Sequence, residues 1–307
     1  DWREREIDLG NLAEKYNEFK HQKIIYIRDK VLERETIFNL SRKARPQPQK
    51  IENIPKNEKE YDPFCHYETE TPLDELGRLQ NEVAVTSANI SKMADYHSLT
   101  IFKKHQLEEL NEKDFEGAID LSLNWFEKIK RYDEKIKTSI FIWNYHYRGA
   151  ASILHPHFQL LAYIYEPINI SSLSQKLMKY HQSFKSHYLD DYSRLAISLG
   201  IGKEKEECKI WFSLTPPKER GLNIYGNLKP KFLWKVIKAL VESGTQSFNL
   251  FYIVDSTSLK NFGFFVDRGS ISKLNSDFGS LEIFGLPVVS TDPFELAKEI
   301  FSKFSLG

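Results

Sequence analysis

The chain has 307 residues, and its 43 Lys and Arg balance its 43 Asp and Glu, so the net charge is zero. A hydrophobic content of 41% is enough for one large or two medium domains with a real core, and it excludes wholesale disorder. The neutral charge gives no support for nucleic-acid binding, and no apolar run approaches the ~20 residues of a membrane helix. Two cysteines, far apart, argue against a disulfide framework and for a reducing, cytoplasmic compartment.

The N-terminal part of the chain predicts a helix, two strands and a loop. Residues 1–30 mix charged and apolar positions, which favours a helix that leads into a strand at 23–27. Residues 32–46 predict a strand followed by a basic loop, and such loops are usually solvated. Residues 46–60 are rich in Pro, Gln, Lys, Glu and Asn, and predict an exposed loop.

The middle of the chain predicts strands around one long helix. Residues 82–89 predict a strand and turn, and residues 95–105 predict the next strand. Apolar residues recur at helical spacing from 106 to 132, which indicates an amphipathic helix that begins near Asn111 or Asp114. Residues 137–145 predict a further strand.

The C-terminal part repeats this pattern coarsely after a polar helix at 174–188. It predicts a helix at 232–242 and strands at 195–199, 210–214, 248–254, 263–266 and 280–284. A last helix is expected to begin with Asp292 as its N-cap and Pro293 at its first position. We therefore expect an α+β fold in two halves, residues 1–189 and 190–307, each an antiparallel sheet with packed helices.

The most informative stretch is residues 149–165, where small residues precede a long apolar and aromatic run. This order predicts a turn that leads into a buried strand. Side chains alternate across a strand, so His155, His157 and Gln159 share one face. Phe158 points to the other face, where it can pack into the core.

Two imidazoles and an amide on one face suit phosphoryl chemistry. A neutral imidazole can attack phosphorus and form a phosphoramidate, while a neighbouring amide can donate to the oxygens that gain charge. Backbone N–H groups of a small-residue loop can hold a phosphate. Because short motifs are weak, a strand with two metal-binding or surface-facing histidines is the alternative interpretation.

The pattern G-x-x-S-x-x-H-P-H-x-Q, from Gly149 to Gln159, resembles the active-site strand of the galactose-1-phosphate uridylyltransferase branch of the histidine-triad superfamily, G-C-S-N-P-H-P-H-G-Q. Ser152 keeps the family's spacing before the first histidine. The resemblance implies that His157 is the nucleophile that carries the nucleotide covalently. It also implies that Ser152 and Gln159 contact phosphate. Phe158 replaces the family's glycine, and strand alternation puts its ring on the opposite face.

The resemblance assigns further nucleotide-binding residues. Arg42 and Arg45 keep the R-x-x-R-P spacing of arginines that approach the phosphates of the nucleotide sugar, and the planar guanidinium matches phosphate oxygens. Asn144 stands where the family has the phosphate-contacting asparagine of F-E-N-K-G. The family holds the base and ribose with an Asn-Asp or Asn-Lys pair. Only Ser87 and Asn89 are available at this place, so the identity of the base that is bound stays open.

The resemblance also implies one structural zinc. The family takes two ligands from a C-x-x-C pair; this chain has Asp62 at the first position and keeps Cys65. A carboxylate can bind zinc. His105 occupies the position of the family's ligand histidine, and the resemblance places His155 on the metal side of the motif. The expected ligands are therefore Asp62, Cys65, His105 and His155.

Two alternatives for the metal remain open: His66 and Glu68 can substitute as ligands, or Cys65 is simply a small buried residue without metal. The family's second metal site uses histidines near the C-terminus, and counting excludes it here, because all nine histidines lie at or before His187. Residues 263–265, Gly-Phe-Phe, stand where the family's second half has H-x-H. The second histidine-triad-like half is thus expected to be catalytically silent, serving the core and leaving room for the interface of a homodimer.

The resemblance implies a nucleotidyltransferase with a nucleotide sugar and a sugar phosphate as partners. His157 attacks the α-phosphorus, the sugar 1-phosphate leaves, and a second sugar phosphate takes the nucleotide in a ping-pong cycle. If phosphate is the acceptor, the protein is a phosphorylase of nucleotide sugars or dinucleoside polyphosphates. A nucleotide-binding protein without turnover is the remaining alternative, motivated by the lost C-terminal histidines and the lost cysteine.

Overall fold

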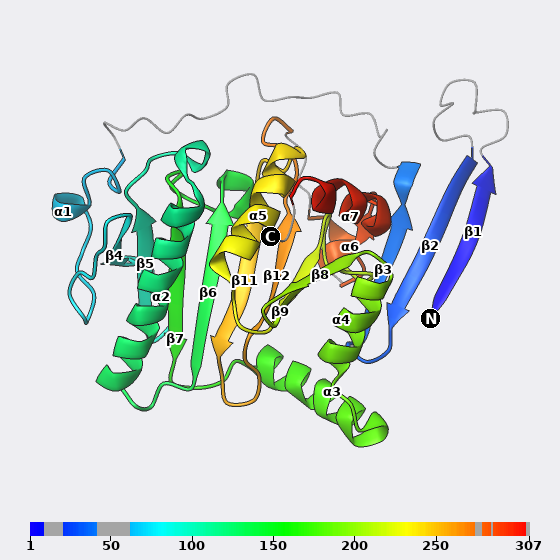
Figure 1. Ribbon diagram of the computed structural model, residues 1–307, viewed down its shortest axis with the longest axis horizontal. Coiled ribbons are helices and arrows are strands. Elements are labelled where there is room, and N and C mark those ends of the chain that lie inside the picture. Colours follow the sequence, from blue (N-terminus) through cyan, green and yellow to red (C-terminus); the bar gives the residue numbers. More distant parts are fainter. Residues whose placement is uncertain (9–20, 42–61, 274–277, 284, 305–307) are drawn as a thin grey trace.

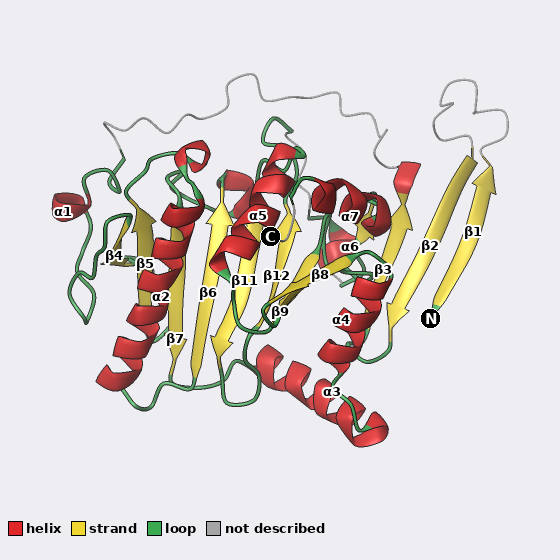
Figure 2. Cartoon of the chain, viewed as in Figure 1, coloured by secondary structure: helices red, strands yellow, loops and turns green. Residues whose placement is uncertain are grey.

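The computed structural model describes residues 1–8, 21–41, 62–273, 278–283 and 285–304. Two β-sheets and their packed helices form an α+β fold, as predicted (Figures 1 and 2). The larger sheet has nine antiparallel strands and runs without a break through both predicted halves. In spatial order its strands are β4 (Ala84–Ala88), β5 (Tyr96–Phe102), β7 (His157–Tyr163), β6 (Thr138–Tyr145), β11 (Phe248–Asp255), β12 (Phe262–Asp267), β10 (Leu222–Tyr225), β9 (Cys208–Phe212) and β8 (Gly202–Lys205).

The smaller sheet joins the two ends of the chain. Its strands are, in order, β1 (Trp2–Asp8), β2 (His21–Asp29), β3 (Arg34–Asn39) and β13 (Val288–Val289). Strand β13 pairs with β3 in parallel, whereas the other pairs are antiparallel. A strand from the C-terminal part of the chain therefore completes the sheet that the N-terminal part begins.

The helix predicted at the N-terminus is wrong, because residues 2–8 form β1 and residues 21–29 form β2. Cross-strand contacts explain the strand. Arg3 lies opposite Tyr26 with its guanidinium carbon 4.2 Å from the ring centroid, and Lys23 forms an ion pair with Glu4 at 2.9 Å. The charged alternation that looked helical is thus the exposed pattern of an edge strand.

Helices cover one face of the larger sheet. Figure 1 shows α2 and α5 side by side in front of it, and the two helices contact each other. The helical segments of the described residues are α1 (Tyr67–Glu70), η5 (Leu107–Glu109), α2 (Glu112–Tyr132), η6 (Tyr147–Gly149), α3 (Ile168–Phe184), α4 (Tyr188–Ser198), α5 (Pro230–Glu242), α6 (Ser280–Ile283) and α7 (Pro293–Ser302).

Two predicted strands are helical instead. Residues 195–198 continue α4, because Leu189, Tyr192 and Ala196 are buried at helical spacing and tie the segment to the core. Residues 280–283 form the short helix α6, whose start is closed by a hydrogen bond from the Gly279 N–H to Glu282 Oε2 at 3.0 Å. In both places a short apolar run gave no periodicity that separates helix from strand.

The core lies between the sheet and the helices. Phe158 is fully buried there, with its ring against Phe102, Phe115, Phe141 and Trp143. The prediction that this ring points away from the face of His157 and Gln159 is therefore confirmed. Strand alternation leaves His157 and Gln159 on the opposite face of the sheet.

The strand order is symmetric about the central β6–β11 pair, so that β12 corresponds to β7. Ile142 pairs with both Gln159 and Phe251, and Phe251 pairs with Phe264. Gln159, Ile142, Phe251 and Phe264 therefore lie in one row across the four central strands. Phe264 belongs to the predicted Gly-Phe-Phe segment, and its ring offers no polar atom at the end of this row.

Candidate active site

His157 begins β7 and is held in one tautomer by the backbone. Its side chain is buried, and its Nδ1–H donates to the carbonyl oxygen of His155 at 2.8 Å. A carbonyl oxygen can only accept, so the ring proton lies on Nδ1 and Nε2 carries the free lone pair. Burial lowers the pKa of His157 to about 4. The ring is therefore neutral near pH 7, as a nucleophile must be.

Gln159 follows on the same face, and its amide is also oriented. Its Oε1 accepts from His97 Nε2 at 3.0 Å and from Asn89 Nδ2 at 3.5 Å. The Met93 N–H donates to His97 Nδ1 at 3.1 Å, which places the proton of the neutral His97 ring on Nε2. With its oxygen engaged in this way, Gln159 presents its NH₂ group as a donor.

His97 is a positioning residue that the sequence pattern did not reveal. In sequence it is one of several histidines without a motif, yet it is completely buried against Gln159. Burial lowers its pKa to about 4, so it also stays neutral. The pairing of Leu99 with Gln159 brings His97 to this place. Such a register between β5 and β7 is not visible in either strand alone.

A pocket of about 260 Å³ opens on this face of the sheet. It brings together several residues that the sequence analysis selected: Ser87, Asn89, Ser152, His157 and Gln159. Ser87 is fully buried, and its hydroxyl donates to the carbonyl oxygen of Pro72 at 2.9 Å. Asn89 accepts from the Ser91 N–H at 2.8 Å while its NH₂ group faces Gln159. Both predicted base-side residues are thus already hydrogen-bonded.

The remaining predicted phosphate residues lie beside this pocket or outside the described residues. Asn144 lines a larger cavity of about 720 Å³ between β3 and the nine-stranded sheet. Gly149 is buried at the base of the loop that carries Ser152. Arg42 and Arg45 fall in residues 42–61, which are outside the described residues.

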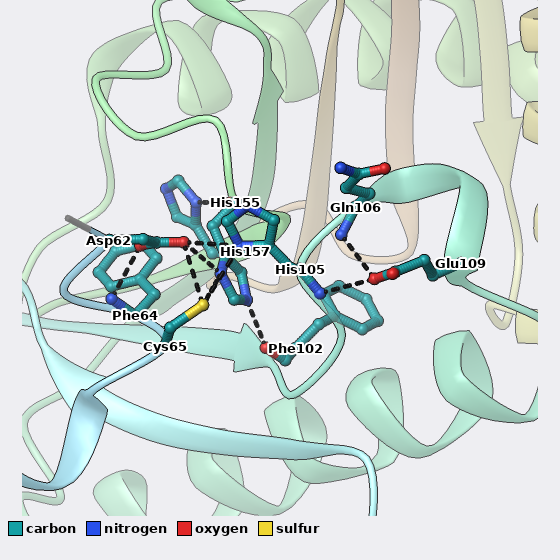
Figure 3. Close-up of polar contacts among 9 residues, drawn as sticks. All are labelled: Asp62, Phe64, Cys65, Phe102, His105, Gln106, Glu109, His155 and His157. Atoms are coloured by element: carbon teal, nitrogen blue, oxygen red, sulfur yellow. Dashed lines mark hydrogen bonds and ion pairs between the residues drawn. The ribbon is translucent and has the colours of Figure 1, made fainter. Parts of the chain in front are cut away.

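The four predicted metal ligands meet in one cluster (Figure 3). One potential ligand atom from each of Asp62, Cys65, His105 and His155 lies within 4.8 Å of the others. Asp62 Oδ2 is 2.7 Å from His155 Nδ1 and 3.0 Å from His105 Nδ1. Cys65 Sγ is 3.2 Å from His105 Nδ1 and 3.8 Å from His155 Nδ1. Ligands around a tetrahedral zinc stand roughly 3.3–3.6 Å apart, and the four spacings bracket this range. The two that involve Asp62 are shorter, at hydrogen-bond distance.

Hydrogen bonding at His155 supports a cation in this cluster. His155 Nε2 lies 2.6 Å from the carbonyl oxygen of Phe102 and must donate its proton there. In the neutral ring Nδ1 then has only a lone pair, which faces the fully buried carboxylate of Asp62. Two lone pairs at this distance need a cation between them, either a proton or a metal ion. The backbone contact on Nε2 is also the usual support of a metal-bound histidine.

The alternative ligands lie elsewhere. His66 and Glu68 are exposed, and neither belongs to the cluster. Within the described ranges, Asp62, Cys65, His105 and His155 are the one group of this kind. Over those same ranges, every helix is too short or too polar to cross a bilayer.

Comparison with known proteins rests on structure, because neither the family models nor the curated sequences contain a match. The ADP-glucose phosphorylase of Arabidopsis thaliana, solved with bound ADP-glucose, is similar at a TM-score of 0.69 and 16% identity, covering 92% of this chain and 99% of its own. A GalT-like protein from Arabidopsis thaliana gives 0.66 and 16%, with coverage of 92% and 99%. A uridylyltransferase structure gives 0.61 and 12%, with 91% and 98%. The chain therefore has the fold of the galactose-1-phosphate uridylyltransferase family, as its H-P-H-x-Q strand predicts.

Proposed function

We propose that this protein is a nucleotidyltransferase that moves a nucleoside monophosphate from a nucleotide sugar to a phosphate-bearing acceptor through a covalent nucleotidyl-His157. The observation that carries the proposal is the protonation pattern at His157. Its Nδ1–H is bound to the His155 carbonyl oxygen, so the unprotonated Nε2 faces outward on the catalytic face of the sheet. A neutral, oriented imidazole of this kind is an activated nucleophile.

The chemistry balances as two displacements. His157 Nε2 attacks the α-phosphorus, the bond from phosphorus to the bridging oxygen breaks, and the sugar 1-phosphate leaves. The His155 carbonyl oxygen stabilises the positive charge that develops on the ring, since it already accepts from Nδ1. In the second step an acceptor oxygen attacks the same phosphorus and the P–N bond breaks, which restores the neutral ring.

Gln159 serves both displacements. Because His97 engages Oε1, the Gln159 NH₂ group is available to donate to a phosphoryl oxygen as charge accumulates on it. Ser152 lines the same pocket and supplies a hydroxyl donor. A donor fixed before the reaction is more effective than one that must reorient during it.

Zinc at Asp62, Cys65, His105 and His155 is the metal that this donor set suits best, and when bound it supplies a structural cross-link beside the nucleophile. The protein's own contribution there is positional. The His155 backbone that accepts from His157 belongs to the residue whose side chain sits in the cluster. A fixed His155 therefore fixes the orientation of the His157 ring.

The larger cavity provides room for the sugar phosphate. Ile142 and Asn144 line it, and Ile142 pairs directly with Gln159, so the cavity adjoins the reaction centre across the β6–β7 pair. The acceptor is either a hexose 1-phosphate, as for a uridylyltransferase, or inorganic phosphate, as for a phosphorylase. Since the ADP-glucose phosphorylase shares the fold, adenine nucleotides belong in any substrate panel.

The test is a panel of ADP-, UDP- and GDP-sugars incubated with hexose 1-phosphate, with inorganic phosphate, or with neither. If hexose 1-phosphate is the acceptor, we expect exchange of the sugar in the hexose 1-phosphate series. If inorganic phosphate is the acceptor, we expect release of a nucleoside diphosphate in the phosphate series. Binding without any product in all three series would instead support a nucleotide-binding protein without turnover.

A further inference from the structure

The loop that links β6 to β7 carries Ser152, and the C-terminal half holds the start of this loop. The Ser247 hydroxyl donates to the carbonyl oxygen of Tyr145 at 2.9 Å. Arg148 Nε donates to the carbonyl oxygen of Arg268 at 3.0 Å. The half of the molecule that lacks a nucleophile therefore supports the loop beside it.

The loop needs this support because its backbone is strained. His146 and Ala150 have φ angles of 64° and 66°, a region that residues with a side chain rarely adopt. Between them, Gly149 packs so closely on β11 that an added Cβ would lie 2.6 Å from the carbonyl oxygen of Phe248. Such a conformation persists only where neighbouring contacts enforce it.

Asn249 on β11 makes the central contact, and its amide orientation is unambiguous. Its Nδ2 donates to the carbonyl oxygen of Gly149 at 2.7 Å and to Asn144 Oδ1 at 2.8 Å. Its Oδ1 accepts from Arg268 Nη1 at 2.6 Å. A carbonyl oxygen can only accept and a guanidinium can only donate, so the amide has one permitted orientation.

This arrangement also orients Asn144. Because Asn249 donates to Asn144 Oδ1, the Asn144 amide must turn its NH₂ group away from Asn249. Asn144 lines the cavity beside the reaction centre, and it lies two residues beyond Ile142, the partner of Gln159. Its NH₂ group is therefore a donor on the catalytic face.

We propose that Asn249 is a positioning residue for nucleotidyl transfer, which holds the Asn144 NH₂ group toward the phosphate and fixes the loop that carries Ser152. The proposal rests on the function proposed above and assigns the C-terminal half a catalytic duty through Asn249. Asn249 itself touches no reacting atom.

The variant Asn249→Asp tests this role with minimal change in shape. The carboxylate keeps its interaction with Arg268, but both donations are lost, and an acceptor then faces the Gly149 carbonyl oxygen and Asn144 Oδ1. Asn144 relieves the conflict by turning its own NH₂ group toward Asp, away from substrate. We expect kcat to fall about 100-fold, the scale of one lost transition-state donor, with little change in nucleotide affinity.

The matched control is Asn261→Asp. Asn261 Nδ2 donates to Asn227 Oδ1 at 3.0 Å, and its Oδ1 accepts from the Tyr252 hydroxyl at 3.3 Å. Asn261→Asp thus makes the same amide-to-carboxylate substitution as Asn249→Asp. It does so in a similar Asn–Asn pair that lies away from the loop. We expect this variant to retain wild-type kcat.

A second readout does not depend on activity. Hydrogen exchange in a peptide spanning residues 145–156 should accelerate in Asn249→Asp and stay at the wild-type rate in Asn261→Asp, because the loop loses its anchor only in the first. Asn249→Ser, which removes both donations without adding charge, replaces Asn249→Asp if that variant does not fold.

The two proposals fail in different ways. Wild-type protein that transfers no nucleotide overturns the proposed function. Hydrogen exchange in the loop peptide still decides whether Asn249 holds the loop. Unchanged exchange in the loop peptide, or an equal loss of kcat in Asn261→Asp, overturns the inference about Asn249.

Discussion

At the scale of single residues, the site is defined by where three imidazole protons lie. His157 carries its proton on Nδ1, His97 carries it on Nε2, and His155 donates from Nε2 to a backbone carbonyl. Each assignment follows from a partner that can only accept or only donate. The sequence motif identifies two of these histidines, but only the tertiary contacts determine which nitrogen of each is available.

The proposed nucleophile, His157, leads to the first prediction. His157→Gly should lower transfer by about 1000-fold or more, because the variant lacks the imidazole proposed to form the phosphoramidate. Nucleotide binding should persist, since Ser152 and Gln159 remain in the pocket. Steady-state rates and equilibrium binding measure the two effects, with the exposed His181→Ala as the control. Turnover that survives in His157→Gly would contradict this role.

His97 gives a prediction about stability and pH. Its pKa is lowered by burial from 6.5 to about 4 in the folded protein, so the unfolded chain takes up the proton first as the pH falls. Stability should therefore decline from pH 6.5 toward pH 4, and part of that decline should disappear in His97→Gln. Urea unfolding across this range measures it. Parallel pH profiles for the two proteins would show that His97 does not contribute.

At the scale of elements, the sequence predicts those whose local signals agree with their packing. The long helix α2 begins after Asn111, whose side chain accepts from two backbone N–H groups, and α7 begins after Asp292 in the same way. Strand β1 and the end of α4 were assigned wrongly, because their patterns are decided by partners distant in the chain. The site follows the same rule: the motif gives His157 and Gln159, whereas His97 and Asn249 depend on strand register.

The β6–β7 loop provides a prediction at this scale. Gly149→Ala would place a methyl group 2.6 Å from the Phe248 carbonyl oxygen, within a paired strand that cannot easily retreat. We expect a loss of about 1–3 kcal/mol in the free energy of unfolding and a clear loss of transfer. Gly279→Ala is the control, because its nearest atom is the flexible end of Glu282, at 3.1 Å. Equal stability of the two variants would contradict the close packing.

At the scale of the whole molecule, the candidate metal cluster joins distant parts of the chain. Asp62 and Cys65 precede α1, His105 follows β5, and His155 precedes β7. A cross-link between such segments stabilises the folded state, since the unfolded chain does not preform the site. The division into residues 1–189 and 190–307, and the homodimer, stay predictions.

We predict about one zinc ion per chain in gently purified protein. Cys65→Ala should lose the metal and lower the melting temperature, whereas the exposed His66→Ala should change neither. Elemental analysis and calorimetry measure the two effects together. Zinc that remains at full stoichiometry in Cys65→Ala would place the ion elsewhere.

The covalent intermediate is the central claim, and one measurement tests it most directly. The protein is mixed with the nucleotide sugar that the panel selects, quenched under alkaline conditions that preserve phosphoramidates, digested and mapped by mass spectrometry. The account predicts a nucleoside monophosphate on the peptide that contains His157, attached to that residue and absent from His157→Gly. A label on His155, or product formation with no labelled peptide, would contradict it.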